Sequence, residues 1–195
     1  IATYRVDEQG VLVRGQAEHA YDFAKVVVGY ADRKSYFVRG PVPYLVFRDD
    51  AQVEHDRAGE YVVRYITYPD NTLTKQGKAM IIKGMRGKSS ALLSVFSEGK
   101  QVQVMEDDVT KATFINRGKE YPYSRYLRRA SARVNAVNPK FLSIVLPYKN
   151  KQDLPKIDVT FDKETDIYTV ILSFKNHTDT LLFNQTDAIL QRKIQ

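Results

Sequence analysis

Short apolar segments separated by turn residues recur along the whole chain, at spacings of roughly ten residues. Many of these segments are rich in Val, Ile, Tyr and Thr, which are frequent in strands. The clearest covers residues 61–68, and Pro69-Asp70-Asn71 ends it. Such a series is typical of antiparallel β-sandwiches. We therefore predict an all-β chain, an antiparallel β-sandwich of two packed sheets that each bury one face.

Two segments have a less clear period. Residues 124–137 contain neither Pro nor Gly, but Arg and Ser alternate with Ala and Val over the second half, which favours a strand. The last residues, 188–195, are compatible with a short helix or a frayed tail. Because the chain shows no internal repeat and no linker rich in Ser or Gly, we predict one domain over residues 1–195, with 186–195 as a possible tail.

The chain of 195 residues contains no cysteine, which excludes disulfides, thiolate metal sites and cysteine nucleophiles. No apolar run reaches the ~18 residues of a membrane helix, so we predict no membrane span. The sequence begins at Ile1 without Met and without a recognisable leader. We therefore expect a mature form or a piece excised from a larger multidomain protein.

Positive charge is concentrated in two stretches, within a formal net charge of +7. Residues 71–97 carry five basic side chains and no acidic one, and residues 117–140 carry seven, with Glu120 as the only acid. One interpretation is a surface for a polyanion. The other is that Lys and Arg keep exposed strand faces soluble and protect sheet edges. The charge count leaves both open.

The kind of polyanion can be narrowed from the second stretch. No nucleic-acid recognition module is visible, so we predict no nucleic-acid partner. Interleaved Tyr and Arg suit an acidic polysaccharide, because a guanidinium pairs with a carboxylate or sulfate at two points and Tyr offers a ring face and a hydroxyl. The predicted binding residues are Tyr123, Arg125, Tyr126, Arg128, Arg129 and Arg133.

In one strand, a spacing of four residues places Arg125, Arg129 and Arg133 on the same face. Arg128 then points to the other face with Tyr126. Three guanidinium groups in a row match the repeated charges of an acidic glycan. The alternative is that Asp or Glu from another strand or domain neutralises the row.

Groups for catalysis or metal binding are scarce. The histidines are widely spaced, fit no metal-ligand pattern and are expected at the surface. They are His19, His55 and His177. Two pairs of adjacent carboxylates, Asp49-Asp50 and Asp107-Asp108, are expected at turns, where Asp is frequent. We therefore predict no metal, no cofactor and no self-contained active site.

The order of the segments resembles the carboxyl-terminal β-sandwich of heparinase II/III-like polysaccharide lyases. An aromatic segment followed by an apolar one that ends in Asp49-Asp50 is similar to the pattern of that family, and so is an apolar run that closes with Pro147. The segments that carry the resemblance are residues 21–30, 33–39, 44–50, 60–68, 91–96 and 141–147.

The resemblance implies an accessory domain of a periplasmic or secreted lyase. Such lyases cleave uronic-acid polysaccharides, glycosaminoglycans included, by β-elimination, with most catalytic groups on a helical domain that would lie upstream in the native chain. No metal or catalytic residue carries over, because no position matches the His and Asp metal ligands of some members. The alternatives are a stand-alone carbohydrate-binding or adhesion module without chemistry, and a structural sandwich inside a larger surface protein.

Overall fold

The computed structural model describes residues 3–17, 30–52, 58–85, 87, 89–109, 113–122 and 127–195. These residues form β-strands and one short 3-10 helix, η3 (Lys151–Asp153), and the ladders between the strands are antiparallel. The prediction of an antiparallel all-β fold is confirmed.

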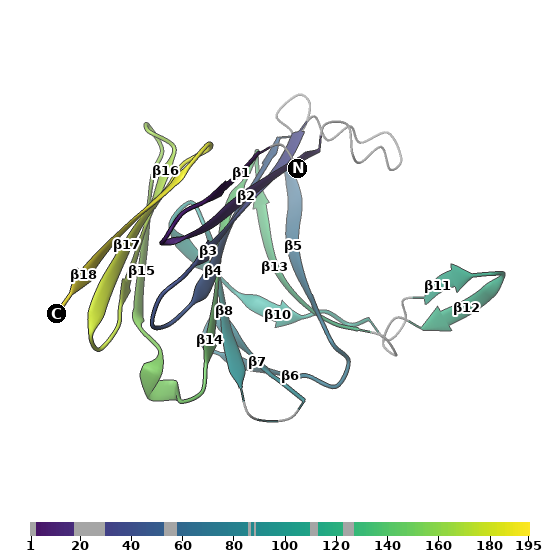
Figure 1. The fold of residues 1–195 in the computed structure, drawn as a ribbon. Coiled ribbons are helices and arrows are strands. Elements are labelled where there is room, and N and C mark those ends of the chain that lie inside the picture. Colours follow the sequence, from purple (N-terminus) through teal and green to yellow (C-terminus); the bar gives the residue numbers. More distant parts are fainter. Residues whose placement is uncertain are drawn as a thin grey trace.

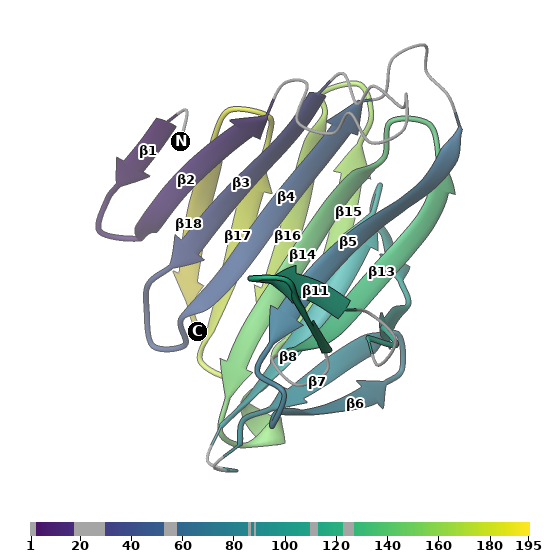
Figure 2. The ribbon, with the colours of Figure 1, turned by 90° about the vertical axis from the view of Figure 1, so that its right-hand side faces the viewer.

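The largest sheet has nine strands, eight of them in one path (Figure 2), and β9 pairs with β8 off this path. It joins strands from the first and middle parts of the chain, because β14 pairs with both β4 and β8. Its strands in spatial order are β1 (Thr3–Val6), β2 (Gly10–Ala17), β3 (Tyr30–Val38), β4 (Tyr44–Gln52), β14 (Lys140–Tyr148), β8 (Ser90–Ser97), β7 (Ala79–Lys83) and β6 (Thr72–Gln76), with β9 (Lys100–Val102) off the path.

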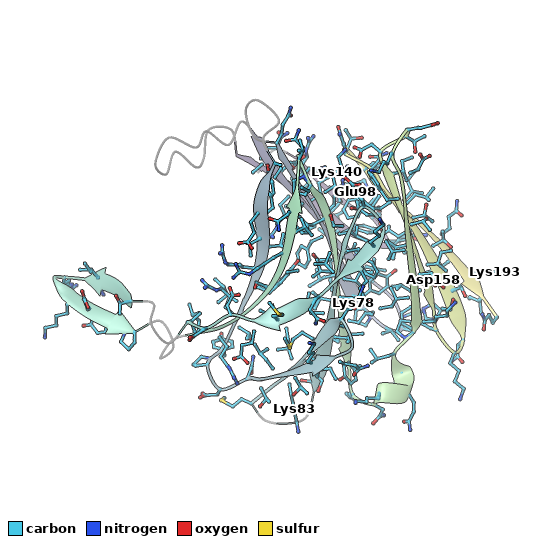
Figure 3. The ribbon with its side chains drawn as sticks, turned by 180° about the vertical axis from the view of Figure 1, so that it is seen from behind. Lys78, Lys83, Glu98, Lys140, Asp158 and Lys193 are labelled. Carbon is cyan, nitrogen blue, oxygen red and sulfur yellow. The ribbon has the colours of Figure 1, made fainter. Side chains whose placement is uncertain are left out.

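Figure 1 shows a smaller sheet on each face of the large one. The four-stranded sheet follows chain order: β15 (Lys156–Asp162), β16 (Ile167–Ser173), β17 (His177–Phe183) and β18 (Ala188–Ile194). The three-stranded sheet has the order β10 (Val104–Glu106), β13 (Arg128–Ala136) and β5 (Gly59–Thr67). A hairpin of β11 (Thr113–Asn116) and β12 (Lys119–Pro122) lies apart from these layers (Figures 1 and 3).

The large sheet buries side chains on both faces. In β14, Leu142 and Ile144 belong to a first core that is shared with the four-stranded sheet, whereas Phe141 belongs to a second core under the three-stranded sheet. In β8, Leu92 and Leu93 divide in the same way. Apolar runs without alternation are typical of strands that are covered on both sides. The sandwich thus has a third layer in addition to the two sheets predicted.

The C-terminal segment differs from the prediction. Ala188 and Leu190 are buried, whereas Ile189 is half exposed, so the segment has the period of a strand. It pairs with β17 over its whole length as β18. The expectation of a short helix or a frayed tail is wrong here, because the inward-facing residues complete the first core. By contrast, β13 confirms a strand within residues 124–137.

A group of charged side chains is buried beside the first core. The fully buried Arg48 places Nε 3.0 Å from both carboxylate oxygens of Asp50. Its Nη2 lies 2.7 Å from Asp166 Oδ2, and its Nη1 donates to the carbonyl oxygens of Asp166 and Phe183. Asp50 is also 2.9 Å from the Nζ of the buried Lys34. Arg48 therefore connects the large sheet to the four-stranded sheet through paired charges.

This group corrects one expectation. Asp49 and Asp50 lie inside β4 and not in a turn. They point to opposite faces, as adjacent strand residues do, because Asp49 pairs with Arg33 while Asp50 faces the buried group. The charge of Arg48 on the same face keeps Asp50 within the strand.

We expect Arg48→Ala to lower the free energy of unfolding by about 3–5 kcal/mol, because it leaves buried carboxylates with too few partners. Urea denaturation followed by circular dichroism would measure the change. As a control, Lys156→Ala removes an exposed ion pair with Asp158 and should cost less than about 1 kcal/mol. Equal effects of the two substitutions would contradict the role assigned to Arg48.

Candidate polyanion-binding surface

Strand β13 places the predicted arginines on two faces. Arg129 and Arg133 alternate with the buried Ala130 and Ala132, so they project from the outer face of the three-stranded sheet. Arg128 falls on the other side of this alternation, as predicted. On the neighbouring strand β5, Arg64 is paired in register with Ser131, which adds another guanidinium to the outer face.

The outer arginines converge on one carboxylate. Asp107 follows β10 and is only 8% exposed. Arg129 Nε lies 2.7 Å from Asp107 Oδ2, in an ion pair rather than an aligned hydrogen bond. Arg133 Nη2 lies 3.2 Å from Oδ1, and Arg64 Nε lies 3.5 Å from Oδ2. The hydroxyl of Ser131 also donates to Oδ1. This carboxylate fixes the positions of three guanidinium groups.

The pKa of Asp107 is lowered from its ordinary value. Burial alone would raise the pKa, but hydrogen bonds from Ser131 and Arg133 and the positive charges of Arg129 and Arg133 outweigh it. Asp107 is therefore ionised at neutral pH.

Two more acids complete the pairing. Arg133 Nη1 lies 3.0 Å from Glu60 Oε1, and Arg128 Nη2 lies 2.6 Å from Glu106 Oε1. Four guanidinium groups on these strands thus face three carboxylates, which leaves one positive charge in excess. The arginine side chains are between 29% and 47% exposed. Within the predicted row, acids of neighbouring strands thus partly neutralise Arg129 and Arg133, as the alternative interpretation expected, and Glu106 pairs with Arg128 on the other face.

The remaining predicted binding residues, Tyr123, Arg125 and Tyr126, lie outside the described residues, so the shared face of Arg125 stays a prediction. In the other basic stretch, Lys75, Lys78 and Lys83 are exposed on and between β6 and β7. Figure 3 shows Lys78 and Lys83 away from Lys193 on the four-stranded sheet. Arg86 and Lys88 lie outside the described part.

Sequence reasoning missed Arg64 and the role of Asp107. Arg64 is a charged residue inside the largely apolar segment 61–68. Its position there could have indicated a functional residue or an arginine that is paired with an acidic side chain. Asp107 was expected in a turn, and it does lie beyond the end of β10. Its three arginine partners could not be inferred, because they come from strands that are distant in sequence.

One expectation about the histidines is wrong. His177 is 5% exposed and begins β17, where its ring stacks on Phe174 at 4.5 Å between ring centroids. The prediction that His177 lies at the surface is wrong because the ring of Phe174 covers its imidazole. His19 and His55 lie outside the described residues. Within the described part of the chain, no three His, Asp or Glu side chains are grouped as a metal site needs, and no described helix has the length and apolar character to cross a membrane.

Comparison with known proteins supplies the fold class. No family model and no curated protein matches the chain. A solved structure of the heparan sulfate lyase HepC from Pedobacter heparinus matches with a TM-score of 0.60 and 13% identity, over 93% of this chain and 27% of that chain. A heparinase III structure with methylated lysines matches with a TM-score of 0.57 and 14% identity, over 100% and 27%. A further heparinase III structure has a TM-score of 0.55.

The chain therefore has the fold of one domain of heparinase III structures, which confirms the predicted resemblance at the level of fold. It spans 27% of the length of each of these three solved chains. Residue roles do not transfer at this identity.

We expect Asp107→Asn to lower the free energy of unfolding at pH 7 by about 1–3 kcal/mol. The folded-state pKa of Asp107 lies below the unfolded value, so its contribution is present above about pH 4 and is lost as the pH falls through the folded pKa. Urea denaturation at several pH values should show the difference from the parent shrinking below about pH 4. Asp158→Asn, in an exposed pair, is the control, and a pH-independent difference would contradict the prediction.

Proposed function

We propose that the chain is an accessory domain of a polysaccharide lyase that acts on acidic, uronic-acid polysaccharides such as glycosaminoglycans. The observation that carries this proposal is the match of 93–100% of the chain to solved structures named as heparinase III and as a heparan sulfate lyase. Those solved chains are much longer than this one, so the proposal includes a helical catalytic domain in the same native chain. It also includes a periplasmic or secreted location.

In this proposal the outer arginines contact the polysaccharide. A guanidinium has enough N–H groups to donate two hydrogen bonds to a sulfate or carboxylate of the ligand while it stays paired with an acidic side chain of the protein. The buried Asp107 holds Arg64, Arg129 and Arg133 in place, which lowers the entropy that they lose on binding. The excess positive charge attracts a polyanion over roughly a Debye length, about 8 Å at physiological salt. Tyr123, Arg125 and Tyr126 would extend this surface.

Three buried tyrosines are poorly suited to act as the base of an elimination. Elimination needs a base for the C5 proton and a group that neutralises the uronate carboxylate. Burial, as the main cause, raises the pKa of Tyr44, Tyr65 and Tyr168 above the ordinary value. A phenol with a raised pKa is a poor base near pH 7.

We expect the isolated chain to be catalytically silent on heparan sulfate, hyaluronan and alginate. The assay follows the absorbance of the unsaturated uronate product over time. A known lyase on the same substrates is the positive control. Robust turnover by this chain would contradict an accessory role and would show a complete site.

We expect the triple variant Arg125→Ala, Arg129→Ala and Arg133→Ala to elute from immobilised heparin at clearly lower salt than the parent. The matched control removes three exposed lysines, Lys100, Lys156 and Lys163, and thus the same charge. A circular dichroism spectrum checks that both variants are folded. Equal elution of the triple variant and the parent would remove this surface from the binding site, and the exposed lysines of β6 and β7 would then be tested.

A further inference from the structure

A cleft of about 730 Å³ lies on the opposite side of the large sheet from the outer arginines. It forms where the β3–β4 loop, the end of β14, η3 and the turn between β16 and β17 meet. In Figures 1 and 2 the C-terminus marks this region, close to the β3–β4 loop. Arg128, Arg129 and Arg133, the described residues of the predicted polyanion surface, do not line it.

Rigid apolar groups form much of the cleft wall. Pro41, Pro43 and Pro147 line it together with Tyr148 and Phe174. The two aromatic residues are at most 9% exposed, so their rings are held by the first core. A preformed apolar wall, open mainly at its prolines, offers a surface for the C–H groups of a sugar ring at a low ordering cost.

Polar side chains surround this wall. The amides of Asn150, Gln152 and Asn176 can both donate and accept hydrogen bonds, which matches sugar hydroxyls. Lys149 and Lys175 are exposed at the cleft and form no ion pair with any described carboxylate. Asp153 also lines the cleft, and its carboxylate accepts a hydrogen bond from the backbone N–H of Asn150. The two lysines exceed this one acid, and the excess positive charge favours an anionic ligand.

The wall also contains a buried histidine with incomplete hydrogen bonding. The Nε2 of His177 has no hydrogen-bond partner among the described residues, and it lies 3.9 Å from Asp179 Oδ1. That carboxylate is already bound by Arg192 at 2.6 and 2.7 Å and by the hydroxyl of Tyr44 at 3.0 Å. Buried polar atoms without a partner are rare in native proteins. Because this nitrogen is closed to solvent, His177 contributes to the packing behind the wall, where its ring stacks on Phe174, and not to the polar surface of the cleft.

We propose that this cleft is a second binding subsite, which takes a sugar unit bearing a carboxylate or sulfate. The proposal rests on the proposed function for the class of polymer, and on the cleft for the place. The sugar ring lies against the prolines, the amides contact its hydroxyls, and Lys149 and Lys175 pair with its acidic group. A long polysaccharide would thus contact both sides of the large sheet.

The test uses titration calorimetry with a hyaluronan hexasaccharide, which carries carboxylates, and with maltohexaose as the neutral probe. The parent should bind the first and not the second. The double variant Lys149→Ala and Lys175→Ala should bind the hexasaccharide at least about tenfold more weakly, because each lost charge-assisted hydrogen bond typically weakens binding by about that factor. The charge-matched control, Lys100→Ala with Lys163→Ala, should stay within about twofold of the parent.

Four results would overturn the subsite: no binding by the parent, unchanged binding by the double variant, equal weakening in the control, or equal binding of maltohexaose. The arginine triple variant separates this proposal from the previous one. If it loses heparin retention while the lysine double variant keeps hexasaccharide binding, only the cleft proposal fails. If hexasaccharide binding depends on the lysines while heparin retention does not depend on the arginines, the arginine surface fails instead.

Discussion

Burial of both faces of β8 and β14 is the constraint on which the rest of the structure depends. Each strand carries buried apolar side chains on both faces, around one buried serine, Ser94 in β8 and Ser143 in β14. Exposing either face to water would therefore cost roughly 25 cal/mol for each Å² of apolar surface. The four-stranded sheet covers one face and the three-stranded sheet the other. The outer arginines and the cleft lie on opposite sides of the large sheet because these two covering layers do.

Guanidinium groups serve two purposes in this arrangement. Arg48 is fully buried, and its donors all meet carboxylates or carbonyls, so it joins two sheets at a fixed distance. Arg129 and Arg133 meet a buried carboxylate on one side and remain partly exposed on the other. The same pairing chemistry therefore stabilises the interior and keeps surface arginines in fixed positions.

Much of the strand content could be predicted, because alternation and turn residues are local signals. The opposite faces of Arg128 and Arg129 followed from the period of a strand. Partners could not be predicted, because Asp107 meets arginines of distant strands. Asp49-Asp50 was assigned to a turn from the frequency of Asp there, although the spacing of Arg48 and Asp50 already indicated a shared face. Nor did the sequence indicate that Phe174 covers the ring of His177.

The order of the strands along the chain has a consequence for synthesis. The large sheet is complete once β14 has been made, but the sheet that covers its first core comes from residues 156–194, which follow it. During translation, one apolar face of the large sheet therefore stays uncovered until β15 to β18 have been made. Apolar surface that is exposed in this way is prone to aggregate. Because β15 to β18 pair only in chain order, this cover forms through local contacts, which favours fast closure.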